Sequence, residues 1–465
     1  MKDYLPLEEK ELPKAIPLKK AIGVGIVITG LSIGTGELIM WPHLVTKYGL
    51  NILWAALLGI IFQYFINQEV GRLSLYTGES FFTTSSRFLK ILPIFWFLSA
   101  IFLYIWPGWS TALGTTLTEL FQIKNHIFWA KISLILIILL TFIGKKAYQL
   151  LENVLKIIVP LFFILLLINS FLNLTLQDIK NALKGLISLG YIPANINLEV
   201  FLGAIVFAGA GGLLNLCVSL WYKDKGLAMN HYAGQIVNPI TGKNQKISIN
   251  GFKFKINSEN LKEWKKWMKI VKFDQGFIFL FLGFITLFLL SLNAYAILTP
   301  KNLVPEGLQI AVIQAHIFGE KWGKIGFDLF LIMAFLMLFS VMWTVIDAFV
   351  RIISDIIYVN SNQGPFEKLL APLKKIKLNH LYYFLIVFIV LTNLFLINLK
   401  QPLSFLTISS VLGGFTMTIY TPLILYINNF KLPKEIRPNW FTNLFLFLAF
   451  IFYLYFSILL IKNYL

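Results

Sequence analysis

The chain of 465 residues is 57% hydrophobic and only 13% charged, with a mean hydropathy of +0.75 and a formal net charge of +18. This composition excludes a soluble globular domain and is typical of a membrane protein with many spans. Apolar runs of about 20 residues predict helical spans, because the strands of a membrane barrel have only about 10 residues. We interpret the positive charge as loop lysines beside a membrane, and we expect no nucleic-acid partner.

Eleven candidate spans form one transmembrane domain, residues 21–465, after an N-terminal tail of residues 1–20. Their approximate bounds are 21–45, 52–76, 92–118, 127–144, 150–172, 198–221, 276–298, 326–357, 380–399, 402–427 and 440–461. Most basic residues share one side if the tail is cytoplasmic, which predicts a cell (inner) membrane protein with its C-terminus outside. The one cysteine, Cys217, lies in an apolar run and cannot form an intramolecular disulfide. We expect a monomer.

The main polar insertion, residues 223–272, is strongly basic. Its middle, residues 235–256, predicts a hairpin over Ile249-Asn250-Gly251. Its end, residues 259–272, carries apolar side chains on one helical face and lysines on the other, which predicts an amphipathic helix on the anionic inner leaflet. A further amphipathic helix, on the outer side, is predicted over residues 305–318.

The stretch Gly34-Thr35-Gly36-Glu37 interrupts the first apolar span. Each glycine weakens a helix by about 1 kcal/mol relative to alanine, and a carboxylate near mid-membrane costs at least about 2.5 kcal/mol. Non-helical backbone is tolerated at this depth only where it faces protein or a watery cavity. The stretch therefore predicts a break in the first helix that lines a solute site.

The sixth span repeats this feature with Ala208-Gly209-Ala210-Gly211-Gly212, followed by Asn215. Two glycine-interrupted spans, five spans apart, indicate an inverted-repeat fold with a central site between the two breaks. We expect repeat one over residues 21–172, repeat two over 198–427, and a peripheral helix over 440–461. In the alternative interpretation, the glycines only permit close helix packing.

Several short motifs of the first two spans and of the start of the sixth resemble those of NRAMP-like transporters in the LeuT-fold superfamily. The motifs are Ile33-Gly34-Thr35-Gly36-Glu37, Tyr48-Gly49, Leu53-Trp54, Gln68-Glu69-Val70-Gly71-Arg72, Thr77-Gly78-Glu79 and Gly203-Ala204-Ile205-Val206. The resemblance implies an all-α integral membrane protein with a LeuT-like five-plus-five inverted repeat, broken first and sixth helices, and alternating access.

The sequence departs from NRAMP metal transporters at the metal-binding motifs. Those proteins carry Asp-Pro-Gly-Asn in the first helix, where this chain has Gly34 to Glu37, and Met-Pro-His in the sixth. Here the sixth-helix region, Phe207 to Gly212, contains neither Met nor His. Because a thioether ligand favours soft metals, the missing Met argues against the usual transition-metal cargo, and we expect no metal ligands. The chain resembles a divergent branch that has a remodelled site.

The glycine stretches are expected to leave volume for a solute, lined also by Thr35, Trp41, Asn215, Trp343 and Thr344. Glu37 alone is a poor cage for a divalent ion. It could bind a hydroxylated solute, carry a proton, or cap the second half-helix. Outside this site, charge spacing predicts ion networks or an inner gate at Asp347–Arg351–Asp355 and Glu69–Arg72. Pro107 predicts a kink, with a second pocket at Trp106-Pro107-Gly108-Trp109. We expect His43 to be exposed at the interface.

Three functions remain open at this point. The leading one is a secondary-active transporter of a small uncharged polar organic solute such as a sugar, with H⁺ as an optional coupling ion and no other cofactor. The second is a divalent-metal transporter (Mn, Fe or Mg) with a non-standard site, and the third is a non-transporting membrane sensor or scaffold that uses the basic loop. No catalytic motif is present, so we do not expect an enzyme.

Overall fold

The computed structural model describes residues 3–464 except 124, 145, 241, 243–246 and 399–401. The first half contains α1 (Leu18–Ala21), α2 (Val24–Ser32), the π-helical segment η1 (Ile33–Met40), α3 (Trp41–Tyr48), α4 (Leu53–Thr77), α5 (Phe81–Ser86), α6 (Leu92–Tyr104), α7 (Gly108–Phe121), α8 (His126–Ile143), α9 (Ala147–Asn173) and α10 (Leu176–Ile187). The second contains α11 (Leu198–Val206), α12 (Gly212–Lys225), α13 (Ser258–Phe273), the π-helical segment η4 (Asp274–Leu282), α14 (Gly283–Leu298), α15 (Ile310–Asn362), α16 (Leu378–Leu396), α17 (Pro402–Phe430) and α18 (Trp440–Tyr464).

The helices account for all of the predicted spans. Ten helical stretches in the described part are long and apolar enough to cross a membrane. The predicted sixth span is divided into α11 and α12, which have 9 and 14 residues and are each too short to cross alone. The prediction of an all-α membrane protein is therefore confirmed.

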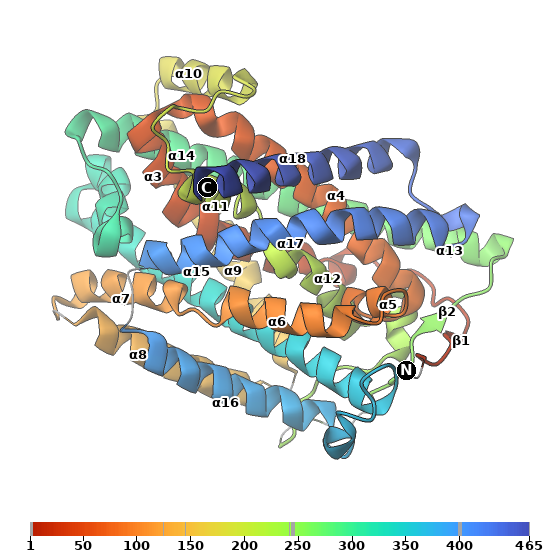
Figure 1. Cartoon of the computed structure of the whole chain (residues 1–465). Coiled ribbons are helices and arrows are strands. Elements are labelled where there is room, and N and C mark those ends of the chain that lie inside the picture. Colours follow the sequence, from red (N-terminus) through yellow and green to blue (C-terminus); the bar gives the residue numbers. More distant parts are fainter. Residues whose placement is uncertain are drawn as a thin grey trace.

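The long helices run along a common direction in one bundle (Figure 1). The N-terminus lies with β1 (Glu8–Glu9), β2 (Phe252–Lys253) and α13 at one end, and the C-terminus lies towards the other. Two long helical stretches are interrupted, one at a proline and one at a glycine. Residues 105–107, which include Pro107, separate α6 from α7, as predicted, and Gly323 interrupts α15 with φ 57°.

The basic insertion folds differently from its prediction. Among the described residues of this segment no hairpin forms around Ile249-Asn250-Gly251; instead, Phe252–Lys253 pairs in parallel with Glu8–Glu9 of the tail. The helix predicted over 259–272 exists as α13, but Trp264, Trp267 and Val271 on its apolar face are buried against protein. The Trp267 indole N–H donates to the Pro13 carbonyl at 2.9 Å. The apolar face therefore contacts the tail and the bundle rather than lipid.

The helix predicted near residues 305–318 is the first part of α15, from Ile310 to the kink. The sequence predicted an exposed His43, and this prediction was wrong. It is buried, and its Nδ1 lies 2.8 Å from the Pro305 carbonyl oxygen. The contact joins α3 to the loop before α15. The burial of His43 therefore depends on a segment far away in the sequence.

Candidate functional site

The first membrane-spanning helix, called helix 1 here, consists of α2, η1 and α3. Contrary to the prediction, it is not broken at Gly34-Thr35-Gly36-Glu37. It continues from α2 through η1 into α3, and the anomaly takes the form of eight π-helical residues, Ile33–Met40. A π-helix keeps the backbone hydrogen-bonded through i→i+5 pairs, so no peptide group needs water in the membrane. Such segments are frequent at functional sites, so the predicted position is still the candidate site.

The two glycines of this stretch pack tightly and leave no open volume beside their own backbone. A Cβ atom at Gly36 would lie 1.8 Å from the Phe207 carbonyl oxygen, and one at Gly34 would lie 2.4 Å from Val341 Cγ2. The expectation of a roomy, glycine-lined space at these positions was therefore wrong. The glycines bring helix 1 into contact with α15 and with the sixth helix.

The sixth helix is broken as predicted. Residues 207–211 separate α11 from α12, and Gly211 and Gly212 have φ values of 66° and 52°, in the region that favours glycine. Gln63 of α4 spans the break. Its Nε2 donates to the Val206 carbonyl at 2.8 Å, and its Oε1 accepts from the Gly211 N–H at 2.8 Å. One side chain thus satisfies a backbone donor and an acceptor that the break releases.

Two tyrosines complete the support of this break. The Tyr104 hydroxyl accepts from the Leu214 N–H at 3.0 Å, and the Tyr420 hydroxyl donates to the Gly212 carbonyl at 3.0 Å. Asn215 is fully buried and donates through Nδ2 to the Tyr420 hydroxyl at 3.2 Å. The other amide atom, Asn215 Oδ1, is buried without a hydrogen-bond partner among the described residues.

Glu37 is fully buried in the middle of helix 1. Its Oε1 accepts a hydrogen bond of 2.7 Å from the Ser32 hydroxyl, whereas Oε2 has no partner in the described part of the chain. A Cβ atom at Gly283 would lie 3.9 Å from Oε1, so the carboxyl group faces α14. Oε2 of Glu37 is thus available to bind a solute or a proton.

The other residues predicted for the site are not all gathered around Glu37. Trp41 is buried beside the sixth helix and donates through Nε1 to the Ala204 carbonyl at 3.0 Å. Trp343 and Thr344 are buried in α15, and the Thr344 hydroxyl donates to a carbonyl of its own helix at 2.7 Å. No hydrogen bond in the described structure links either to Glu37. The side chain of Thr35 lies outside the described part.

The predicted ion network on α15 exists and extends to two further helices. Arg351 donates through Nε to Asp347 Oδ2 at 2.7 Å and also pairs with Asp224 of α12. Asp347 accepts in addition from the Trp221 indole at 3.2 Å and from the Tyr382 hydroxyl of α16 at 2.5 Å. All five side chains are buried, so the network fixes the ends of α12, α15 and α16 together.

The remaining charged pairs differ from the predictions in one detail. Glu69 and Arg72 pair at 2.6 Å, as predicted, and Asn428 of α17 donates to Glu69 at 2.9 Å. Asp355, predicted to pair with Arg351, instead pairs with Lys223 of α12 at 2.9 Å. Charge spacing on one helix could not show that a neighbouring helix supplies a nearer cation.

The sequence reasoning missed three buried polar residues: Gln63, described above, Asn67 and Asp274. Asn67 of α4 is fully buried, and neither atom of its amide has a partner among the described residues. Asp274 accepts from the N–H groups of Gly23 and Gly25 at 3.0 and 2.8 Å, so it holds the start of helix 1 against η4. The sequence does contain a signal for these residues, because Gln63, Asn67 and Asp274 are polar and lie within or at the edge of apolar runs.

The site offers oxygen and amide groups rather than a metal cluster. Within the described residues, no group of three or more His, Cys, Asp or Glu side chains is arranged to hold a metal ion. The chemistry present is the Glu37 carboxyl group on helix 1, and the buried amides of Gln63 and Asn215 at the sixth-helix break with their supporting tyrosines.

Comparison with known proteins identifies relatives by structure only. No protein-family model and no curated protein matches the chain. Among solved structures, an Eremococcus coleocola manganese transporter, in complex with an aromatic bis-isothiourea substituted compound, matches with a TM-score of 0.67 at 10% identity, over 98% of this chain and 91% of that chain. MhsT in complex with L-phenylalanine has a TM-score of 0.58 at 15% identity, over 97% of this chain and 99% of that chain.

A third match is Mhp1, a nucleobase-cation-symport-1 family transporter in a closed conformation with bromovinylhydantoin bound, with a TM-score of 0.50 at 15% identity over 98% and 93% of the two chains. At these identities the matches show the fold. The chain is an α-helical membrane protein with the LeuT-type fold that these transporters share. Of the three, the manganese transporter has the highest TM-score, in line with the NRAMP-like motifs of the sequence.

Proposed function

We propose that this chain is a secondary-active, alternating-access transporter of a small, uncharged, polar organic solute such as a sugar. The observation that carries the proposal is the break between α11 and α12, which packs on helix 1 beside Glu37, a buried carboxyl group with one unpartnered oxygen. Broken helices at the centre of an inverted repeat are where solutes bind in this class of fold.

The donor and acceptor set suits a neutral, hydroxylated solute. Leaving a polar group buried and unpaired costs about 1–3 kcal/mol, and Glu37, Asn67 and Asn215 each leave at least one atom unpaired in the described structure. The hydroxyl groups of a sugar can both donate to the oxygens and accept from the Asn67 amide. A divalent cation instead requires six or so oxygen ligands, which one carboxyl group does not supply.

Glu37 is also the residue that we propose as the proton carrier. It is the acidic side chain that lies within the π-helical segment of helix 1, and one of its oxygens is held by Ser32 while the other is unpaired. A carboxyl group that gains and loses a proton at mid-membrane can couple solute movement to the proton gradient.

Uptake by proteoliposomes tests the proposal. With an inward proton gradient and a panel of sugars, polyols, Mn²⁺ and Mg²⁺, we expect saturable uptake of a neutral solute. Glu37→Gln should abolish proton-driven accumulation but retain solute exchange, because the amide still forms hydrogen bonds and cannot carry the proton. Glu259→Gln, an exposed carboxylate in the first turn of α13, is the matched control and should transport normally. Mn²⁺ uptake without uptake of any neutral solute would overturn the proposal.

Transport of a divalent metal is the second candidate. It is favoured by the TM-scores of 0.67 and 0.68 to structures of the Eremococcus coleocola manganese transporter, and by Glu37 Oε2 together with the carbonyl groups freed at the sixth-helix break. In this case Glu37→Gln should remove both net uptake and exchange of the metal, because the amide has no charge to offer. The retention of exchange therefore separates the two candidates.

A further inference from the structure

A cavity of about 280 Å³ lies away from the candidate site, between α1, the start of α9, the end of α12 and the loop that follows. It is at the end of the bundle where helix 1 begins. Its lining is basic, with lysines from three separate segments of the chain: Lys19, Lys20, Lys146, Lys156 and Lys225.

The positive charge of this cavity is only partly neutralised. The five lysines outnumber the two lining carboxylates, Glu152 and Asp224, by three. Glu152 is shared, since its Oε1 lies 2.5 Å from Lys156 Nζ and 2.7 Å from Lys225 Nζ. Asp224 is engaged by Arg351. The ammonium groups of Lys19, Lys20 and Lys146 form no ion pair with any residue in the described part of the chain.

We propose that this cavity binds a phosphate-bearing anion, either free phosphate or the phosphomonoester headgroup of a lipid. Lysine ammonium groups bind phosphate as point charges with three donors each, and phosphate oxygens can accept from several of them at once. The proposal concerns binding alone and does not depend on which solute the central site carries.

Such an anion has a structural consequence, because it links three elements. Lys20 belongs to α1, just before helix 1, whereas Lys146 and Tyr148 belong to the start of α9 and Lys225 ends α12. Close by, Asp274 holds the N–H groups of Gly23 and Gly25. The bound anion thus reinforces the contact that fixes this end of helix 1 against the bundle.

Calorimetric titration of the purified full chain in nanodiscs of phosphatidylcholine tests the proposal. Sodium phosphate should bind saturably, while sodium chloride and sodium acetate at matched ionic strength should not. Lys20→Gln/Lys146→Gln should weaken phosphate binding by about tenfold, because it removes two charged donors. Lys20→Gln alone should weaken it by about threefold, because it removes one of these two donors.

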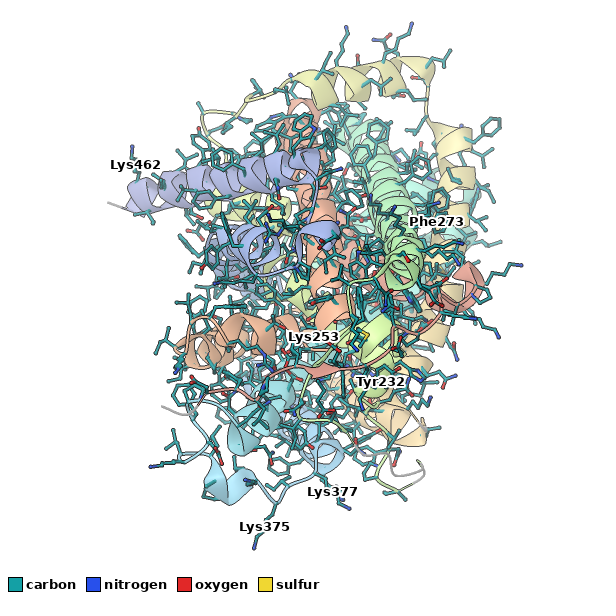
Figure 2. The ribbon with its side chains drawn as sticks, turned by 90° about the vertical axis from the view of Figure 1, so that its right-hand side faces the viewer. Tyr232, Lys253, Phe273, Lys375, Lys377 and Lys462 are labelled. Carbon is teal, nitrogen blue, oxygen red and sulfur yellow. The ribbon has the colours of Figure 1, made fainter. Side chains whose placement is uncertain are left out.

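The control variant, Lys321→Gln/Lys462→Gln, makes the same change in charge at two exposed lysines of α15 and α18 that do not line the cavity; Figure 2 shows Lys462 at the edge of the molecule. It should bind phosphate as the unmodified chain does. All variants are compared only if their melting temperatures in chloride match that of the unmodified chain; if the double variant melts early, the result with Lys20→Gln alone decides.

A second arm distinguishes the two sources of the phosphate group. The chain is reconstituted with phosphatidic acid, and retained lipid is measured by native mass spectrometry. Retention that is lost in Lys20→Gln/Lys146→Gln assigns the site to a lipid headgroup, whereas phosphate binding in phosphatidylcholine without such retention assigns it to the free ion. The absence of saturable binding in both arms, or an equal loss in the control variant, overturns the proposal.

Discussion

Gly36 shows how a single position connects the two halves of the molecule. Its missing side chain lets helix 1 approach the backbone of Phe207, which lies at the break of the sixth helix. The sequence marks Gly36 as unusual, because glycine is costly inside a membrane helix. It could not show whether the missing side chain leaves a space or allows a contact, because that depends on what lies opposite.

Gly36→Ala should destabilise the protein by about 1–3 kcal/mol, since a methyl group would overlap the Phe207 carbonyl and neither backbone segment can move freely. Gly319→Ala is the matched control. There the added Cβ would meet its nearest neighbour, Phe327 Cβ, at 3.5 Å, an ordinary contact, and alanine favours the helix.

Unfolding can be followed with a thiol-reactive dye, because the one cysteine, Cys217, is buried. We expect Gly36→Ala to react at a lower temperature than the unmodified chain and Gly319→Ala to react at the same temperature or a higher one. Equal unfolding temperatures for the two variants would show that the close contact at Gly36 is not essential.

At the scale of the element, helix 1 and the sixth helix solve the same problem in two ways. Helix 1 retains its backbone hydrogen bonds by widening to a π-helix over Ile33–Met40. The sixth helix releases its bonds over residues 207–211, and Gln63 supplies the missing partners from α4. Both solutions reduce the number of backbone polar groups left without a partner, which lipid cannot supply.

Gln63→Met should therefore destabilise the break. The substitution retains the length of the side chain but leaves the Val206 carbonyl and the Gly211 N–H unpaired, at a cost of about 1–3 kcal/mol for each group. We expect a lower melting temperature and slower transport. Gln177→Met, at an exposed position of α10 where the amide bonds only Asn181 of the same helix, is the control and should change neither. Normal stability in Gln63→Met would mean that water replaces the amide.

Other elements show where a pattern along the chain predicts a helix but not its partner. The alternation of apolar and lysine residues over 259–272 correctly indicated α13. The apolar face lies against the N-terminal tail through Trp267 and Pro13, because a nearby protein surface competes with lipid for the same side chains. The predicted hairpin failed for a similar reason, since the tail supplies the strand that pairs with Phe252–Lys253.

For the whole molecule, the number of crossings determines where the termini lie. Ten long helical stretches in the described part, together with the divided pair α11 and α12, give an odd number of crossings. Figure 1 agrees, since N and C lie towards opposite ends of the bundle. The distribution of lysine and arginine then favours a cytoplasmic N-terminus and an external C-terminus.

Terminal fusions check this orientation. A green fluorescent protein fused to the N-terminus should fluoresce, and alkaline phosphatase fused to the C-terminus should be active, because the first folds in the cytoplasm and the second only outside. The reciprocal pair of fusions serves as the control and should be inactive in both cases. Activity of both reporters at one terminus, or the reverse pattern, would contradict the assignment.

The sequence by itself determined the class of protein, the approximate spans and the two unusual positions in the first and sixth helices. These features follow from local physics, namely the length of apolar runs and the cost of glycine or a carboxylate inside a membrane. Gln63 bridging the break, Asp274 holding Gly23 and the packing of Gly36 were decided by tertiary structure alone. Each of these contacts joins residues more than 100 positions apart, and the partner of a buried polar group depends on which helix folds beside it.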